Sequence, residues 1–126
     1  MTSRAAVRKI SKSVRYWQKK GVAPGWHIDY FPAPGLNSIL ATTWSPGYRW
    51  ANIKINTGSE YLNGAEKLIK RCVLHELVHL HIATIHDWVD LNFEDDGPIG
   101  RDVANRMETV VDATTNLIWN LSEGEF

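Results

Sequence analysis

Three features of the sequence predict an α+β fold, an arrangement in which helices pack on a small three-stranded sheet. Residues 4–19 and 102–121 carry apolar side chains at spacings of three and four, as amphipathic helices do. Residues 26–56 instead contain three short apolar segments separated by glycine and proline, which is typical of strands and turns. Residues 63–85 are apolar around most of the helical circumference, which predicts a helix buried in the core.

The size and composition of the chain are those of an ordinary folded domain. We expect residues 1–126 to form a single domain, because 126 residues suffice for one core and no linker divides them. No apolar stretch approaches the roughly 20 residues that cross a bilayer, so no membrane partner is expected. A single cysteine and the lack of a recognisable secretory signal favour a cytoplasmic location.

The first predicted helix, residues 4–19, places Ile10, Val14 and Trp17 on one face and ends before Gly21. Its remaining surface is strongly basic, since the first twenty residues contain seven Lys and Arg side chains and no acid. Such a surface can contact nucleic acid. Charge runs are more often a solvated face, however, and this is the interpretation we favour.

Residues 26–31 predict the first strand, which the following prolines end. Residues 36–44 and 48–56 predict two more strands, and the short Ser45-Pro46-Gly47 turn between them indicates an antiparallel hairpin. Within the last strand, every second residue from 51 to 55 is apolar, so one of its faces is expected to be buried.

The buried helix is expected to begin near Asn63, with Glu66 three residues later as its capping partner. It should continue unbroken to about Ile85, because its second half contains neither glycine nor proline. An acidic loop, residues 87–100, should then connect it to the final helix at 102–121.

The buried helix carries the motif HExxH at His75, Glu76 and His79. Because the two histidines are one turn apart, both imidazoles leave the helix on the same side and can bind one metal ion. Glu76 lies beside that site and can take a proton from a metal-bound water without being a ligand. So short a motif also occurs by chance, but unpartnered His and Glu are costly in so apolar a segment. The sequence therefore predicts one zinc ion per chain.

The third zinc ligand could come from the last predicted helix or from residues closer in sequence to the motif. Glu108 could bind zinc while Asp112, four residues later, accepts a hydrogen bond from a ligand histidine. Both acids lie off the apolar stripe expected for this helix, which includes Val110 and Leu117, with Glu108 near its border and Asp112 further round. The alternative is therefore that both are exposed acids without a ligand role. His86 is the main alternative metal ligand, although an unbroken helix places it roughly 10 Å beyond His79. Weaker candidates are acids of the expected loop, namely Asp87, Asp90 and Glu94.

The strand at 53–56, the HExxH helix and the later Glu108-x-x-x-Asp112 together resemble a zincin metallopeptidase, in particular the minimal single-domain gluzincins. The resemblance implies a zincin-like fold, with an N-terminal helix, a three-stranded sheet, an active-site helix and a C-terminal helix. It also implies that His75, His79 and Glu108 bind zinc, that Glu76 is the general base, and that Asp112 orients a ligand histidine.

The same resemblance implies how a substrate binds. A peptide or protein substrate would lie antiparallel to a sheet edge formed by the strand that precedes the active-site helix. The residues of that strand expected to bind substrate are Ala51, Asn52, Ile53 and Lys54. A tyrosine or histidine would stabilise the oxyanion of the tetrahedral intermediate, and the candidates are His81, Tyr61 and Tyr48.

We therefore expect a zinc-dependent metallopeptidase, a hydrolase that uses a zinc-activated water and Glu76 as base. The alternative is a catalytically idle domain of the same fold that binds nucleic acid or a protein partner through its basic N-terminal helix. An intact Glu76 favours the enzyme, since an idle site has no need of that carboxylate. The only cysteine, Cys72, is expected to be a buried and inert thiol.

Overall fold

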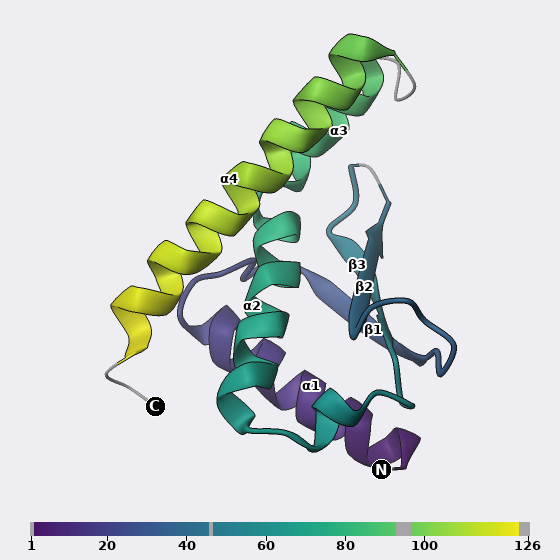
Figure 1. The fold of residues 1–126 in the computed structure, drawn as a ribbon. Helices are drawn as coiled ribbons and strands as arrows, with labels where there is room; N and C mark the ends of the chain where they lie inside the picture. The colour runs from purple at the N-terminus through teal and green to yellow at the C-terminus, as the bar shows by residue number, and fades with distance from the viewer. Residues whose placement is uncertain (1, 46, 93–96, 124–126) are drawn as a thin grey trace.

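The computed structural model of the chain describes residues 2–45, 47–92 and 97–123. These residues form four α-helices, a short 3-10 helix and a three-stranded sheet, which confirms the α+β class (Figure 1). In chain order the elements are α1 (Ser3–Lys19), β1 (His27–Pro32), β2 (Leu40–Trp44), β3 (Trp50–Ile55), η1 (Glu60–Asn63), α2 (Glu66–His81), α3 (Ala83–Asn92) and α4 (Pro98–Ser122). Figure 1 shows α2 standing between the long helix α4 and the sheet.

Helix α1 packs its apolar side inward, as the sequence predicts. The side chain of Thr2 caps its first turn by accepting a hydrogen bond from the backbone nitrogen of Ala5, 3.1 Å away. The residues of its buried face are at most 1% exposed: Ala6, Ile10, Val14 and Trp17. Trp17 also donates a 2.8 Å hydrogen bond from Nε1 to the carbonyl of Lys70, which ties α1 to α2.

The sheet has the strand order β1-β3-β2, with β1 parallel and β2 antiparallel to β3. The predicted hairpin of β2 and β3 is thus confirmed, although β2 begins at Leu40 rather than at residue 36. The alternation in β3 is also confirmed, because Ala51, Ile53 and Ile55 are at most 1% exposed.

The central position of β3 contradicts the expected substrate site. Strand β3 is paired with a neighbour on each side, so it has no free backbone edge on which a peptide could lie. The four residues assigned to substrate binding, Ala51, Asn52, Ile53 and Lys54, instead hold the middle of the sheet together. The free edges of the sheet are those of β1 and β2.

Helix α2 differs from its prediction at both ends. It begins at Glu66 after Ala65, which offers no side-chain cap, so the expected capping box at Asn63 is wrong. It also ends at His81 rather than near Ile85. The residue that follows, Ile82, has φ −107° and ψ 17°, and α3 begins directly after it.

Helix α3 occupies part of the segment that was expected to be an acidic loop. Residues 87–92 are helical and α4 already begins at Pro98, so the loop prediction is wrong over these residues. Residues 93–96, which include Glu94, lie outside the described residues. A tertiary hydrogen bond from Trp44 Nε1 to Asp87 Oδ1, 2.9 Å long, attaches α3 to the end of β2.

Helix α4 turns a different side to the core than expected. Val110 and Leu117 are 49% and 60% exposed, so the apolar stripe assigned to them is wrong. The buried side chains are those of Val111, Thr115 and Trp119. Glu108 and Asp112 lie three residues before Val111 and Thr115, beside this buried side, with side chains 52% and 60% exposed.

The buried residues of α1, the sheet, α2 and α4 form one hydrophobic cluster. Among the described residues, no helix combines the length and the apolar character that spanning a membrane requires.

We expect Ile53→Ala to destabilise the fold by about 2–5 kcal/mol, because it leaves a cavity in the fully buried centre of β3. Urea unfolding followed by tryptophan fluorescence measures this loss. The neighbouring exposed residue provides the control, since Lys54→Ala should change the free energy of unfolding by about 0.5 kcal/mol or less. Equal effects of the two substitutions would contradict the assignment of β3 as the central strand.

Candidate metal centre

The two histidines of the motif point away from the core because their neighbours on α2 point into it. Leu74, Leu77 and Val78 are at most 1% exposed, which fixes the rotation of the helix about its axis. His75 and His79 therefore emerge on the side that faces α4, with side chains 30% and 15% exposed. This is the shared direction that their spacing predicts.

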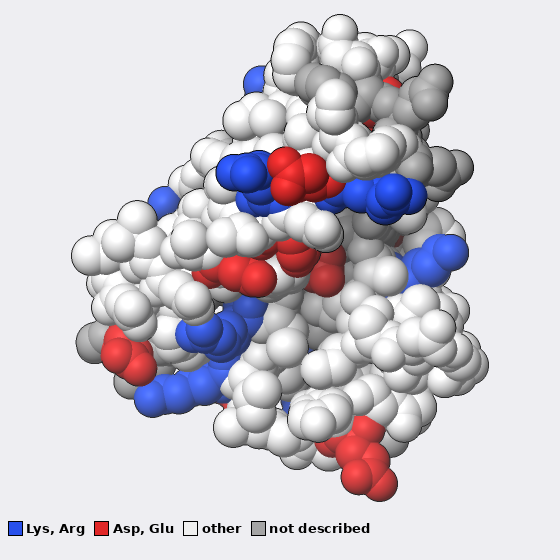
Figure 2. Space-filling model, turned by 45° about the horizontal axis from the view of Figure 1, so that its top comes forward, with Lys and Arg blue, Asp and Glu red and all other residues white. Residues whose placement is uncertain are grey.

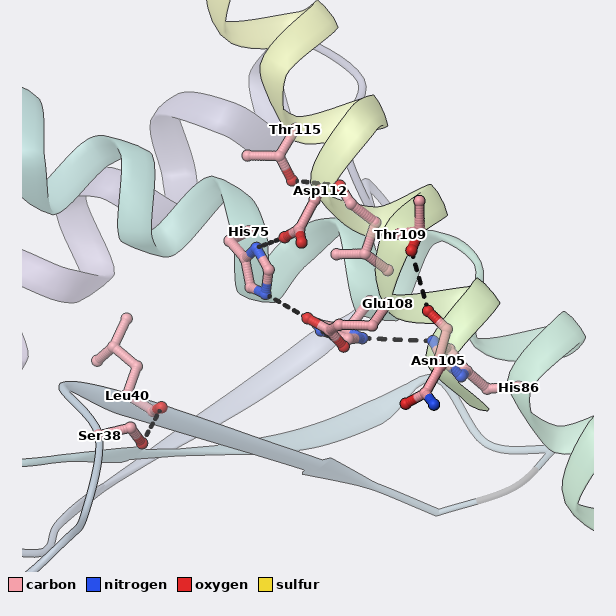
Figure 3. A network of polar contacts seen from close by, with 11 residues as sticks. Ser38, Leu40, His75, His86, Asn105, Glu108, Thr109, Asp112 and Thr115 are labelled. Atoms are coloured by element: carbon pink, nitrogen blue, oxygen red, sulfur yellow. Dashed lines mark hydrogen bonds and ion pairs between the residues drawn. The ribbon is translucent and has the colours of Figure 1, made fainter. Parts of the chain in front are cut away.

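Helix α4 brings a carboxylate to both imidazoles. Glu108 Oε1 is 3.1 Å from His75 Nε2, and Glu108 Oε2 is 3.4 Å from His79 Nε2. One ligand atom from each of the three residues lies within 4.8 Å of the other two, so the group could hold a metal ion. Figure 3 shows His75 of α2 and Glu108 of α4 pointing toward one another.

Two of the observed separations are of the size found between ligands that share a metal ion. Zinc binds histidine nitrogen and carboxylate oxygen at about 2.0–2.2 Å, so two ligand atoms of a tetrahedral site lie about 3.3–3.6 Å apart. The two nitrogen–oxygen distances, 3.1 and 3.4 Å, are close to that edge length. The donor set of two imidazoles and one carboxylate is also one that catalytic zinc sites use.

The outer nitrogens of the two imidazoles also have polar neighbours. His75 Nδ1 is 3.4 Å from Asp112 Oδ1, and His79 Nδ1 is 3.3 Å from His86 Nε2 (Figure 3). A neutral imidazole has one N–H, so it can donate to only one of its two neighbours. If His75 and His79 donate their Nδ1 protons to Asp112 and His86, their Nε2 lone pairs face Glu108. A cation between them would then be coordinated by both imidazoles and by the Glu108 carboxylate.

Burial lowers the pKa of His79 and the pKa of His86, with nearby carboxylates such as Glu108 acting in the opposite direction. The neutral imidazole is the form that binds metals. Partial burial between α2, α3 and α4 therefore favours the protonation state that a metal ligand requires.

Glu76 lies beside these ligands in a less solvated position. Burial raises the pKa of its carboxyl group, and the hydroxyl of Thr42 on β2 and the charge of His75 lower it in part. The Thr42 hydroxyl is buried, and Glu76 is the polar side chain beside it within the described residues. Glu76 thus faces β2 while His75 and His79 face α4.

A cavity of about 620 Å³ opens in front of His75 and Glu76. Its other walls are α4 around Asp112 and residues 38–40, which lead into β2. Figure 2 shows carboxylates gathered in the hollowed centre of this face. At the β2 wall, the Ser38 hydroxyl donates a 2.7 Å hydrogen bond to the carbonyl of Leu40 (Figure 3).

Sequence reasoning missed the contribution of β2 to this site. Thr42 and residues 38–40 became candidates only once the strand order was known, because the hairpin pattern leaves open which strand is outermost. The structure also places His86 next to His79, whereas the predicted unbroken helix put it roughly 10 Å beyond His79. His86 is nevertheless not one of the three converging residues, which are His75, His79 and Glu108.

The remaining acids proposed as ligands lie elsewhere. Asp87 accepts the hydrogen bond from Trp44, and Asp90 lines a smaller cavity of about 200 Å³ with His86 and Glu108. Glu94 is outside the described residues.

The three candidates for oxyanion stabilisation are not among the described residues that line the 620 Å³ cavity. His81 Nδ1 accepts a 2.9 Å hydrogen bond from the backbone nitrogen of Ala23, and with Tyr48 it lines a separate cavity. Tyr61 lines a third cavity near Leu62. The donor for an oxyanion therefore stays unassigned.

Part of the basic surface of α1 is engaged within the chain. Lys9 Nζ donates a 2.8 Å hydrogen bond to the carbonyl of Leu62, and Lys12 Nζ lies 3.8 Å from Glu66 Oε1. Lys20 Nζ lies 5.7 Å from the centre of the Tyr16 ring. The contacts of Lys9 and Lys12 join α1 to η1 and α2.

Comparisons of the chain with protein-family profiles, with curated proteins and with solved structures found no match. The interpretation of the site therefore rests on its own geometry and chemistry.

We expect Cys72 to react slowly with iodoacetamide in the folded protein. Cys72 is half-buried, not buried as expected, and lines the 620 Å³ cavity. Partial burial and the nearby Glu76 charge still raise the pKa of the thiol, which lowers the fraction of reactive thiolate at mildly alkaline pH. Mass spectrometry over a time course, with the urea-unfolded chain as reference, measures the rate. Alkylation of the folded protein at the rate of the unfolded chain would contradict this prediction, because it would mean that the thiol is accessible to the reagent and that its pKa is not raised.

Proposed function

We propose that the protein is a zinc-dependent metallopeptidase with a zincin-like active site. The observation that carries the proposal is the convergence of His75, His79 and Glu108, with one ligand atom from each within 4.8 Å of the others. Glu76, the residue needed as general base, lies directly beside His75 on the same helix. A carboxylate 29 positions after His79 also faces both imidazoles, at 3.1 and 3.4 Å, which supports the proposal.

Zinc is the metal that best suits these ligands. Two imidazoles and one carboxylate are borderline donors, whereas Mg²⁺ and Ca²⁺ prefer sites made of oxygen atoms. Three protein ligands also leave a fourth position open for water, which distinguishes catalytic zinc sites from structural ones. The absence of a fourth ligand among the converging described residues supports a catalytic role.

The roles of the side chains follow from their positions. A zinc ion bound at this site supplies Lewis acidity, which lowers the pKa of a bound water to about 7. Glu76 is placed to accept the proton of the attacking water and then to donate it to the leaving amine. Its partly buried carboxylate is directed toward the cavity, where the scissile bond of a peptide would lie.

The strand best placed to bind an extended substrate is β2, which has a free backbone edge. Its first residue, Leu40, lines the same cavity as His75 and Glu76, whereas β3 lies in the middle of the sheet. An extended peptide can add to such an edge through main-chain hydrogen bonds. The cavity would then receive a side chain adjacent to the scissile bond, between β2, α2 and α4.

We expect the purified wild-type protein to hold about one zinc ion per chain, and His79→Ala and Glu108→Ala to lose it. Inductively coupled plasma mass spectrometry measures the metal content. Asp102→Ala is the matched control, because Asp102 is an acid of the same helix that pairs with Arg106, at 2.9 Å, outside the site. Retention of zinc by Glu108→Ala would mean that Glu108 is not the third ligand.

Substitution of the base should separate catalysis from metal binding. We expect Glu76→Gln to keep its zinc but to cleave peptides at least about 100-fold more slowly, since the proton acceptor is lost. A peptide library of mixed sequence, analysed by mass spectrometry, offers many cleavage sites at once and measures the rate. A wild-type protein that binds zinc but cleaves no peptide would favour the catalytically idle binding domain instead.

A further inference from the structure

A histidine of α3 contacts one of the three converging residues from outside the group. His86 Nε2 is 3.3 Å from His79 Nδ1, while His79 Nε2 lies 3.4 Å from Glu108 Oε2. The centres of the two imidazole rings are 5.4 Å apart. His86 therefore contacts the nitrogen of His79 that points away from the proposed metal position.

The surrounding structure holds His86 in this place. Its ring centre is 5.5 Å from that of Trp44, at the end of β2. The same tryptophan donates a hydrogen bond to Asp87, the next residue of α3. The change of direction at Ile82 turns α3 so that His86, seven residues after His79, comes back beside it.

The chemistry of a metal-bound imidazole determines what this contact does. When His79 binds a metal through Nε2, its proton is on Nδ1, which then needs an acceptor. His86 Nε2 is the acceptor that the structure places there. We propose that His86 is a positioning residue, which accepts a hydrogen bond from His79 Nδ1 and holds His79 in the tautomer and ring orientation that bind zinc. This inference rests on the zinc site of the proposed function.

The two ligand histidines are then oriented from two different helices. His75 Nδ1 faces the carboxylate of Asp112 on α4, and His79 Nδ1 faces the imidazole of His86 on α3. A neutral imidazole acceptor adds no negative charge to a site that already contains the carboxylates of Glu76, Glu108 and Asp112. It can therefore orient His79 without increasing the repulsion among these carboxylates.

Zinc affinity, measured by chelator competition near neutral pH, tests the proposal with two substitutions at the same position. His86→Gln keeps a side-chain oxygen that can accept the hydrogen bond, whereas His86→Leu has no acceptor. His27→Leu is the matched control, since His27 is an exposed histidine that pairs with Asp29 on β1. Thermal unfolding of the metal-free proteins establishes that each variant is folded.

We expect His86→Leu to bind zinc about 10- to 100-fold more weakly than the wild type. His86→Gln should recover most of that affinity, and His27→Leu should lose none. Wild-type affinity in His86→Leu would overturn the inference while leaving the proposed zinc site intact. Equal losses in His86→Gln and His86→Leu would also overturn it, because a ligand or a purely packing role predicts that result. A wild-type protein without zinc affinity would refute both the inference and the proposed function.

Nitrogen–proton NMR correlation spectra of the zinc-loaded wild type test the tautomers without any substitution. The proposal requires the proton on Nδ1 of both His79 and His86. A proton on Nε2 of His86 would contradict it, whatever the behaviour of the variants.

Discussion

Helix α2 is packed against α1, β2 and α4, and this burial determines which of its side chains can reach the surface. Leu74, Leu77 and Val78 are buried almost completely, and the hydrogen bond from Trp17 to the carbonyl of Lys70 links α1 to the same helix. The rotation of α2 about its axis is therefore set by the hydrophobic core. His75 and His79 take their direction from that packing, so the proposed metal centre lies on a rigid element.

The polar groups beside α2 come from three other elements. Helix α4 contributes Glu108 and Asp112, α3 contributes His86, and β2 contributes Thr42 next to Glu76. A bound zinc ion would cross-link α2 and α4 and neutralise part of the negative charge between them. Because the unfolded chain lacks this arrangement, zinc binding would also stabilise the folded state.

Local sequence patterns predict α1, the three strands, the middle of α2 and α4, but they do not predict α3. The spacing of His75 and His79 places them on one side of a helix, and the spacing of Glu108 and Asp112 does the same on another. The prediction of which side of α4 faces the core is wrong, because its exposed apolar residues, such as Leu117, form the more regular stripe. Exposed apolar side chains are common, so a stripe alone does not identify the buried side.

Long-range contacts account for the remaining differences. The break after His81 occurs without glycine or proline, and the contact that accompanies it, from Trp44 to Asp87, joins residues 43 positions apart. The strand order likewise depends on the parallel pairing of β1 with β3, two strands that β2 separates in the sequence. Neither contact leaves a local signal, so sequence reasoning places His86 too far from His79 and takes β3 for the edge strand.

Anomalous diffraction at the zinc absorption edge, from crystals grown with zinc, tests the proposed metal centre most directly. We expect one strong peak about 2.0–2.2 Å from His75 Nε2, His79 Nε2 and a carboxylate oxygen of Glu108. In the same map, His86 should contact His79 Nδ1 and lie outside bonding distance of the metal. A peak bonded to His86, or no peak between α2 and α4, would contradict the proposed metal centre.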